Sequence, residues 1–248
     1  MKRIYNNWFT RLLFFIGGIF SLRLIATALH ITTLEKLYKP RDFRKTSHLE
    51  ISQDIIDRLP RYCQTIFGRK MDPINLLFIG TEAGIQRAFE KAGWDGAHPS
   101  SPVHVGLGLA SSLFNRTYRK GPFMPLFISI GLQDLSFQNV LKQGYGQRHH
   151  IRLWRTRHQL PNGNRLWVAA ATFEKSFKLM PKPPFLYHHM EPNLDFERDH
   201  IIGELVRQGH QAAGEYRLHE AIKPKYPRRN PNGDPYYTDG KALAIEIV

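Results

Sequence analysis

Two periodicities in the hydrophobic pattern predict most of the secondary structure. Residues 74–80 (INLLFIG) form a continuous apolar run typical of a buried strand. The next residues carry apolar side chains at helical spacing, so a helix is expected after Thr81, which would be its N-cap. A second helix is expected within residues 191–209, with Asp195 as its N-cap and Gly209 as its end.

The remaining apolar patterns predict strands. Residues 148–160 and 165–177 flank the sequence PNGN, and Asn162-Gly163 between two strand-like runs predicts a β-hairpin. Further strands are expected in 123–131 and 182–190 and near the C-terminus, whereas the glycine-containing residues 132–147 are expected to be a loop. Strands grouped with a few helices, without regular alternation, predict a single α+β domain with a largely antiparallel or mixed sheet.

The N-terminus has a different pattern. Basic residues precede an apolar run from Leu12 to Leu22, and small residues follow at Ala26 and Ala28. This pattern is typical either of a cleaved secretory signal peptide or of an uncleaved membrane anchor. We therefore expect a hydrophobic N-terminal helix in an anchor or signal segment (1–30), a basic linker (31–47) and the α+β domain (48–248), with the side of the membrane left open.

The composition indicates what kind of partner the chain binds. The chain has 35 Lys and Arg residues against 21 Asp and Glu residues, a formal net charge of +14, which favours an anionic partner such as a membrane surface, a phosphorylated small molecule or a nucleic acid. Neither a helix-turn-helix nor another nucleic-acid-binding signature is present, and the hydrophobic N-terminus also argues against nucleic acid. Cys63 is the only cysteine, which excludes an intramolecular disulfide and a cysteine-based zinc site.

Two His-His pairs supply the candidate chemistry. In a strand, successive side chains point to opposite faces, so Arg148, His150, Arg152 and Trp154 share one face while His149 lies on the other. The same rule separates the two histidines of the second pair. We expect His149 and His188 to be core residues, and His150 and His189 to lie at the surface, where they are candidate proton donors and acceptors.

The helix after the second pair adds charged candidates. Asp195, Arg198 and Asp199 lie on one face, in line with an apolar stripe. In one interpretation Asp195 caps the helix and Arg198 pairs with a carboxylate, which would fix the helix to the sheet. In the other, these three residues face His150 and His189 across a cleft and form an acid/base or anion-holding site. No metal-binding motif is evident, and a cofactor cannot be named.

Several long motifs resemble one known family. Residues 72–81 (DPINLLFIGT), 148–154 (RHHIRLW), 188–200 (HHMEPNLDFERDH) and 236–242 (YYTDGKA) are similar to the LssY C-terminal domain family. That domain occurs alone or after DedA-like and type-2 phosphatidic-acid-phosphatase-like segments, so the resemblance implies a bacterial envelope protein in a lipid-related setting. The family has no established activity. One departure is Glu191, where the family pattern has an aspartate.

These observations lead to three hypotheses. The first is a membrane-anchored domain that binds an anionic lipid or phosphorylated ligand, with Arg148, Arg152, Trp154 and Arg198 as binding residues. The second is a phosphoester or lipid-phosphate hydrolase in which His150, His189, Asp195 and Asp199 carry out acid/base catalysis. The third is an assembly domain whose partner is a membrane protein.

Overall fold

The structure, a computed structural model, describes the backbone of residues 8, 11–19, 21–22, 51–65, 68–96, 126–128, 131–141, 147–159, 163–181 and 184–248. Within these ranges, side chains are described except for those of residues 176–188. The chain divides into two compact units, Met1–Arg41 and Asp42–Val248.

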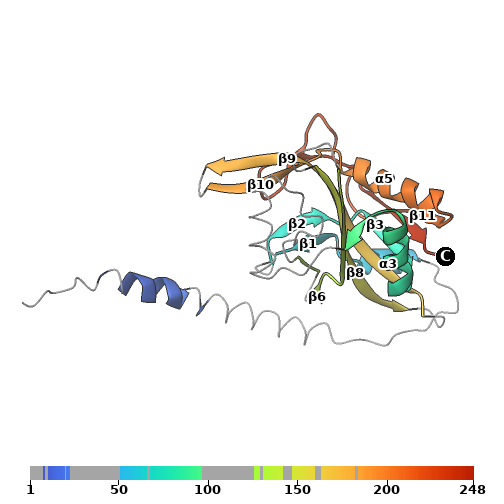
Figure 1. The fold of residues 1–248 in the computed structure, drawn as a ribbon, viewed down its shortest axis with the longest axis horizontal. Coiled ribbons are helices and arrows are strands. Elements are labelled where there is room, and N and C mark those ends of the chain that lie inside the picture. Colours follow the sequence, from blue (N-terminus) through green and yellow to red (C-terminus); the bar gives the residue numbers. More distant parts are fainter. Residues whose placement is uncertain are drawn as a thin grey trace, which may run out of the picture. The chain divides into compact units, whose positions relative to one another are not determined.

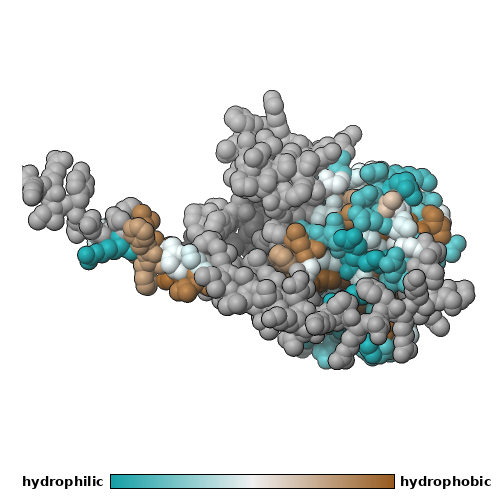
Figure 2. All heavy atoms as spheres, turned by 90° about the horizontal axis from the view of Figure 1, so that it is seen from below, coloured by the Kyte–Doolittle hydropathy of each residue, from teal (hydrophilic) through white to brown (hydrophobic). Residues whose placement is uncertain are grey.

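The described residues of the first unit are helical, and their large apolar side chains are exposed, Phe14 by 77% and Phe15 by 66%. Figure 2 shows these side chains in brown along the helix. In the part of the chain that the structure describes, no helix is both long enough and apolar enough to span a bilayer. Residues 23–47, which include the expected end of the anchor and the expected linker, lie outside the described residues.

A large mixed sheet forms the centre of the second unit (Figure 1). Its strands follow the order β11-β14-β3-β9-β8-β7-β4, and β10 pairs with the far end of β9. Among the described strands of this sheet, β14 and β3 pair in parallel, and the other pairs are antiparallel. The strands are β3 (Leu76–Gly80), β4 (Asp95–Gly96), β7 (Leu135–Val140), β8 (Arg148–Gln159), β9 (Arg165–Pro181), β10 (Pro184–Met190), β11 (Gln211–Arg217) and β14 (Lys241–Glu246).

Three helices and two small sheets complete the described part of this unit. The helices are α2 (Gln53–Arg58), α3 (Glu82–Lys91) and α5 (Leu194–Arg207). One small sheet has the order β2-β1-β5-β6, from β1 (Tyr62–Gln64), β2 (Lys70–Pro73), β5 (Phe127–Ile128) and β6 (Gly131–Leu132). The other is a hairpin of β12 (Arg228–Arg229) and β13 (Pro235–Tyr236). In Figure 1, α3 and α5 cover one face of the large sheet, and β1 and β2 lie on the other side.

The period-two pattern of the strands divides the apolar residues into two cores, one on each face of the large sheet. On β9, Val168 and Ala170 belong to the first core, which α2 and β1 cover, while Trp167, Ala169 and Ala171 belong to the second core, which α3 and α5 cover. The sheet is therefore buried on both faces, and a polar side chain on either face of its central strands needs a partner inside the protein.

The structure confirms the α+β class, the buried strand at 76–80 and the hairpin of β8 and β9. Thr81 caps α3 as expected, since its hydroxyl accepts a hydrogen bond from the Gly84 amide at 3.0 Å. The loop prediction for residues 132–147 was wrong for β7, which adds to the edge of β8 and buries Phe137. Asp195 is not the N-cap of α5, because Asn193 takes that position and accepts from the Asp195 amide.

Candidate functional site

The histidines of the first pair lie on opposite faces of β8, as the alternation predicts. His149 is 7% exposed and His150 is 3% exposed, so the expectation that His150 lies at the surface was wrong. The reason is that β8 is a central strand with both faces covered. Each histidine is held by a different carboxylate.

On the first-core face, Arg148 and His150 share Glu174, on the neighbouring strand β9. Arg148 donates to both carboxylate oxygens of Glu174 and, at 3.2 Å, to Gln138. His150 lies 3.3 Å from Glu174 through Nδ1, and its Nε2 lies 2.7 Å from the hydroxyl of Thr172. His150 and Glu174 are buried, Arg148 is partly buried, and Glu174 contacts both of the others, which fits a polar brace inside the sheet rather than an open binding site.

The next residues on this face are equally enclosed. Arg152 lies 3.4 Å from the carboxylate of Asp72 on β2, and both side chains are buried. Burial raises the pKa of Asp72, and the charge of Glu174 adds to the rise, while the positive charge of Arg152 opposes it. Trp154 is 1% exposed and packs in the first core, so its ring has no exposed face for a ligand.

On the second-core face, His149 contacts α5. Its Nδ1 lies 2.6 Å from the Glu197 carboxylate, and its ring stacks on His200 at 4.3 Å between centroids. Burial raises the pKa of Glu197, although the bond to His149 opposes the rise. His149 is therefore a core histidine, as expected. Its partner was missed, because Glu197 reads in the sequence as one more charge on a helix.

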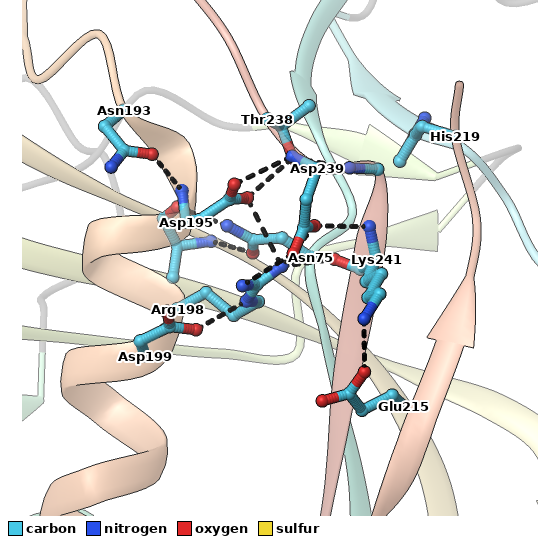
Figure 3. Close-up of polar contacts among 12 residues, drawn as sticks. Asn75, Asn193, Asp195, Arg198, Asp199, Glu215, His219, Thr238, Asp239 and Lys241 are labelled. Carbon is cyan, nitrogen blue, oxygen red and sulfur yellow. Dashed lines mark hydrogen bonds and ion pairs between the residues drawn. The ribbon is translucent and has the colours of Figure 1, made fainter. Parts of the chain in front are cut away.

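Arg198 anchors the start of α5 to the turn before β14 (Figure 3). Its guanidinium donates to both oxygens of Asp239, at 2.7 and 3.2 Å, to Asp199 at 2.8 Å and to the Lys241 carbonyl at 3.0 Å. Asp195 lies 3.3 Å from the same guanidinium and accepts from the hydroxyl of Thr238 and the amide of Asp239.

The electrostatics of this network are those of a structural anchor. Burial lowers the pKa of Arg198, but its bonds to Asp239 and Asp199 outweigh this effect and the net shift is upward. Burial alone would raise the pKa of Asp239, and the bond to Arg198 reverses the shift to a net lowering. Arg198 thus pairs with a carboxylate and fixes the helix, as the simpler interpretation of the sequence predicted, although its chief partner is Asp239.

His189, near the end of β10, has a different environment. Its Nδ1 lies 2.7 Å from Oδ1 of Asp234, whose side chain is 2% exposed, whereas the His189 side chain is 32% exposed. Asp234 lies in the turn between β12 and β13, where Asn230 accepts hydrogen bonds from the amides of Asn232 and Asp234. Residues 230–234 (NPNGD) are recognisable as a turn in the sequence, but nothing local indicates that the turn contacts β10.

The predicted site residues are therefore not assembled into one cleft. Among the described residues, no hydrogen bond or ion pair joins His150, His189 and Arg198 to one another, because Glu174, Asp234 and Asp239 hold them separately. Asp195 and Asp199 belong to the Arg198 network. In the described part of the chain, no group of three or more His, Cys, Asp or Glu side chains is arranged to hold a metal ion.

A basic segment was missed as a binding feature. Every residue in 223–229 (KPKYPRR) is exposed; four of the seven are basic, and Tyr226 is 69% exposed. Arg228 faces Glu220 at 3.5 Å, but both side chains are more than half exposed, so this ion pair is weak. The sequence shows this segment as a proline-broken basic run, and its exposure becomes evident only from the fold.

Arg61 lies near this segment, because it acts on the same histidine as Arg228 of the segment. Burial lowers the pKa of His219, and the positive charges of Arg61 and Arg228 lower it further, although the bond from its ring to the Ile74 carbonyl opposes the shift. Arg61 and Arg228, far apart in the sequence, thus act on the same histidine. Arg69 also donates to the carbonyl of Pro231, just beyond the basic segment.

Comparison with known proteins bears on the whole domain. No curated protein and no solved structure matches the chain. A family model described as the LssY C-terminus matches residues 56–242, and the chain belongs to this family.

Proposed function

We propose that this domain binds the anionic surface of a membrane, and that residues 223–229 (the basic segment) are the contact. The observation that carries the proposal is that four basic residues around an exposed tyrosine are all exposed. Basic clusters attract anionic headgroups, and a tyrosine ring suits the boundary between headgroups and hydrocarbon. The ammonium of Lys225 lies 5.5 Å from the ring centroid of Tyr226, so charge and aromatic surface are presented together.

The arginines nominated from the sequence are less suited to this role. Arg148, Arg152 and Arg198 are paired with carboxylates inside the protein, and their side chains are 18%, 8% and 5% exposed. An external phosphate would have to displace those carboxylates. The binding surface supported by the structure is thus the basic segment, with the neighbouring Arg61 and Arg69.

The magnitude of the attraction can be estimated. A Lys or Arg close to an anionic bilayer contributes about 1 kcal/mol. The four basic residues of the segment together amount to about 4 kcal/mol, or roughly a thousandfold preference for an anionic over a neutral membrane. The attraction should be strong at an ionic strength of about 0.1 M, where the Debye length is about 10 Å, and weak at about 1 M, where it is about 3 Å.

The N-terminal segment would complement this contact. We propose that residues 1–30 associate with the membrane, because the exposed side chains of their described helix are large and apolar. Covalent attachment to such a segment would keep the domain near the bilayer, which raises the effective concentration of the basic segment at the surface. The setting we propose is the bacterial envelope.

The test compares partition of the full chain into vesicles of phosphatidylcholine with and without phosphatidylglycerol. The N-terminal segment contributes to binding in both cases, so the informative quantity is the ratio of the two partition coefficients. We expect a large ratio that falls at high salt and collapses when the four basic residues of the segment are neutralised (Lys223→Gln, Lys225→Gln, Arg228→Gln, Arg229→Gln).

A matched control removes the same charge elsewhere. Four exposed basic residues outside the segment serve for this: Arg87, Lys91, Arg157 and Arg207. Their replacement by glutamine should leave most of the preference for anionic vesicles intact. If both variants lose the preference equally, only net charge matters and the proposal fails. Soluble glycerol phosphate distinguishes a headgroup surface from a site for small phosphates: competition by it at low concentration would contradict a surface contact.

A further inference from the structure

The His189–Asp234 pair has the geometry of a positioned proton acceptor. An ionised carboxylate accepts hydrogen bonds but cannot donate them, so Asp234 selects the imidazole tautomer with the proton on Nδ1. In that tautomer the lone pair is on Nε2. Among the described residues, Nε2 of His189 has no hydrogen-bond partner, and the ring is partly exposed. A reactant at the surface can therefore reach it.

The carboxylate that orients this ring is itself held in place. The amide of Asp234 donates to Asn230 Oδ1, the amide of Asn230 donates to the Asp234 carbonyl, and the amide of Gly233 donates to the Asn230 carbonyl, all at 2.9 Å. The side-chain amide of Asn230 also donates to the sulfur of Met190, the residue after His189, at 3.3 Å. This turn is thus bound both to itself and to β10, so the pair does not depend on a freely moving loop.

The other buried histidines of the large sheet lack this combination. The side chains of His149 and His150 are 8% and 4% exposed, compared with 32% for His189. His149 packs against the rings of Phe173 and His200, and His150 has contacts at both ring nitrogens. Within the described residues, only His189 combines a buried carboxylate on one nitrogen with a second nitrogen open to a reactant.

The pair also lies next to the basic segment. Arg229 pairs with Pro235 across the hairpin of β12 and β13, and its guanidinium donates to the Gly233 carbonyl at 2.7 Å, next to Asp234. The turn that holds Asp234 therefore connects directly to the residues that we propose contact anionic headgroups. An anion drawn to the basic segment is brought close to His189.

We infer that His189 is the general base of a phosphoester-hydrolysing site and that Asp234 is its positioning residue. The inference rests on the proposed function for its substrate class, a phosphate monoester on a lipid or another anionic carrier. Nε2 of His189 takes a proton from water as the water oxygen bonds to phosphorus. The phosphorus–oxygen ester bond breaks, and the leaving alkoxide takes that proton back from Nε2. The products are an alcohol and inorganic phosphate, and the histidine returns to its starting form.

The experiment measures phosphate release by the full chain from phosphatidic acid in mixed vesicles and from a fluorogenic phosphate monoester. We expect His189→Gln to reduce turnover by about 10²- to 10⁴-fold, the usual contribution of a positioned acid/base group. The control His158→Gln changes a partly buried histidine on β8 and should leave turnover unchanged. Thermal unfolding of each variant shows whether a loss of turnover reflects a loss of folding.

The positioning role of Asp234 has its own readout. Asp234→Asn keeps the size of the side chain but replaces a carboxylate oxygen that pairs with Nδ1 of His189. The ring is then no longer held in one tautomer and orientation, so kcat should fall while KM stays nearly constant, and Asp234→Glu, which keeps the carboxylate, should retain more of the activity than Asp234→Asn. A purely structural role would lower folding stability without separating kcat from KM, and that result would contradict the assignment.

The two proposals fail separately. If the wild-type chain releases no phosphate from either substrate, or if His189→Gln retains full activity, the general-base assignment is overturned, while binding to anionic vesicles is unaffected. If turnover of the soluble ester is present but the preference for anionic vesicles is absent, the catalytic pair stands and the membrane contact fails.

Discussion

Replacing Arg198 with methionine should destabilise the domain by about 3 kcal/mol. The substitution keeps an apolar stem of similar length and removes the guanidinium of a side chain that is only 5% exposed. The substitution removes the three strongest interactions of this side chain: the bidentate pair with Asp239, the hydrogen bond to Asp199 and the hydrogen bond to the Lys241 carbonyl.

Removing one partner of a fully buried ion pair costs about 3–5 kcal/mol, because a charge is left without compensation. Here the value belongs at the lower end. The Asp239 side chain is 41% exposed and Asp199 is 58% exposed, so water can solvate both after the substitution. Asp195 keeps its bonds to the Thr238 hydroxyl and the Asp239 amide. The expected loss therefore comes from the hydrogen bonds of the buried guanidinium and from the attachment of α5 to β14.

The assays are urea unfolding, which gives the free energy of unfolding, and thermal unfolding, which gives Tm, for the wild-type chain and the variant, both followed by circular dichroism. A loss of about 3 kcal/mol corresponds to a fall in Tm of about 6–12 °C for a domain of this size. Arg207→Met is the control, since Arg207 is exposed on the same helix and makes no ion pair with any described residue; it should change stability by less than about 0.5 kcal/mol. A loss below about 1 kcal/mol for Arg198→Met would refute the view that this network anchors α5.

Three further substitutions test the core and two turns. Burial raises the pKa of Glu197, so the folded state binds more protons than the unfolded state above the ordinary pKa of 4.5. The free energy of unfolding of the wild type should therefore fall relative to that of Glu197→Gln as the pH rises above 4.5. A difference between the two that does not depend on pH would contradict the raised pKa. Gly240→Ala should destabilise strongly, because the backbone has φ +81° and a Cβ would lie 2.4 Å from the His219 carbonyl oxygen. Gly233→Ala, at φ +89° with no atom within 4 Å of the added Cβ, should lower the free energy of unfolding by only about 1 kcal/mol. If both alanine variants lose the same free energy of unfolding, the close contact at Gly240 has no effect on stability.

Local structure was predicted from the sequence more accurately than burial was. The alternation along β8 correctly placed His149 and His150 on opposite faces, because side-chain direction in a strand depends only on neighbouring residues. It could not predict that His150 is buried, because burial depends on elements that cover the sheet from elsewhere in the chain. The same limit explains β7, which is a strand because it pairs with β8. The resemblance to the LssY C-terminal family, carried by long motifs, is confirmed.

At the candidate site, the dependence on distant parts of the chain is clearer still. His189 was selected from the sequence, and Asp195 and Asp199 were expected to face it across a cleft, but both of these carboxylates are bound to Arg198. The actual partner, Asp234, lies 45 residues away in a hairpin turn. Single-sequence patterns identify residue types suited to a chemistry, whereas the pairing of His189 with Asp234 depends on how β10 meets that turn.

The most direct test of the membrane contact uses a probe at the basic segment. Cys63 is fully buried, so Tyr226→Cys introduces one reactive thiol for a polarity-sensitive fluorophore, and Glu90→Cys on α3 provides a control position. When the full chain is mixed with vesicles that contain phosphatidylglycerol, the probe at 226 should shift to the blue, and it should not do so with phosphatidylcholine alone. A shift at position 90 but not at 226 would contradict the account.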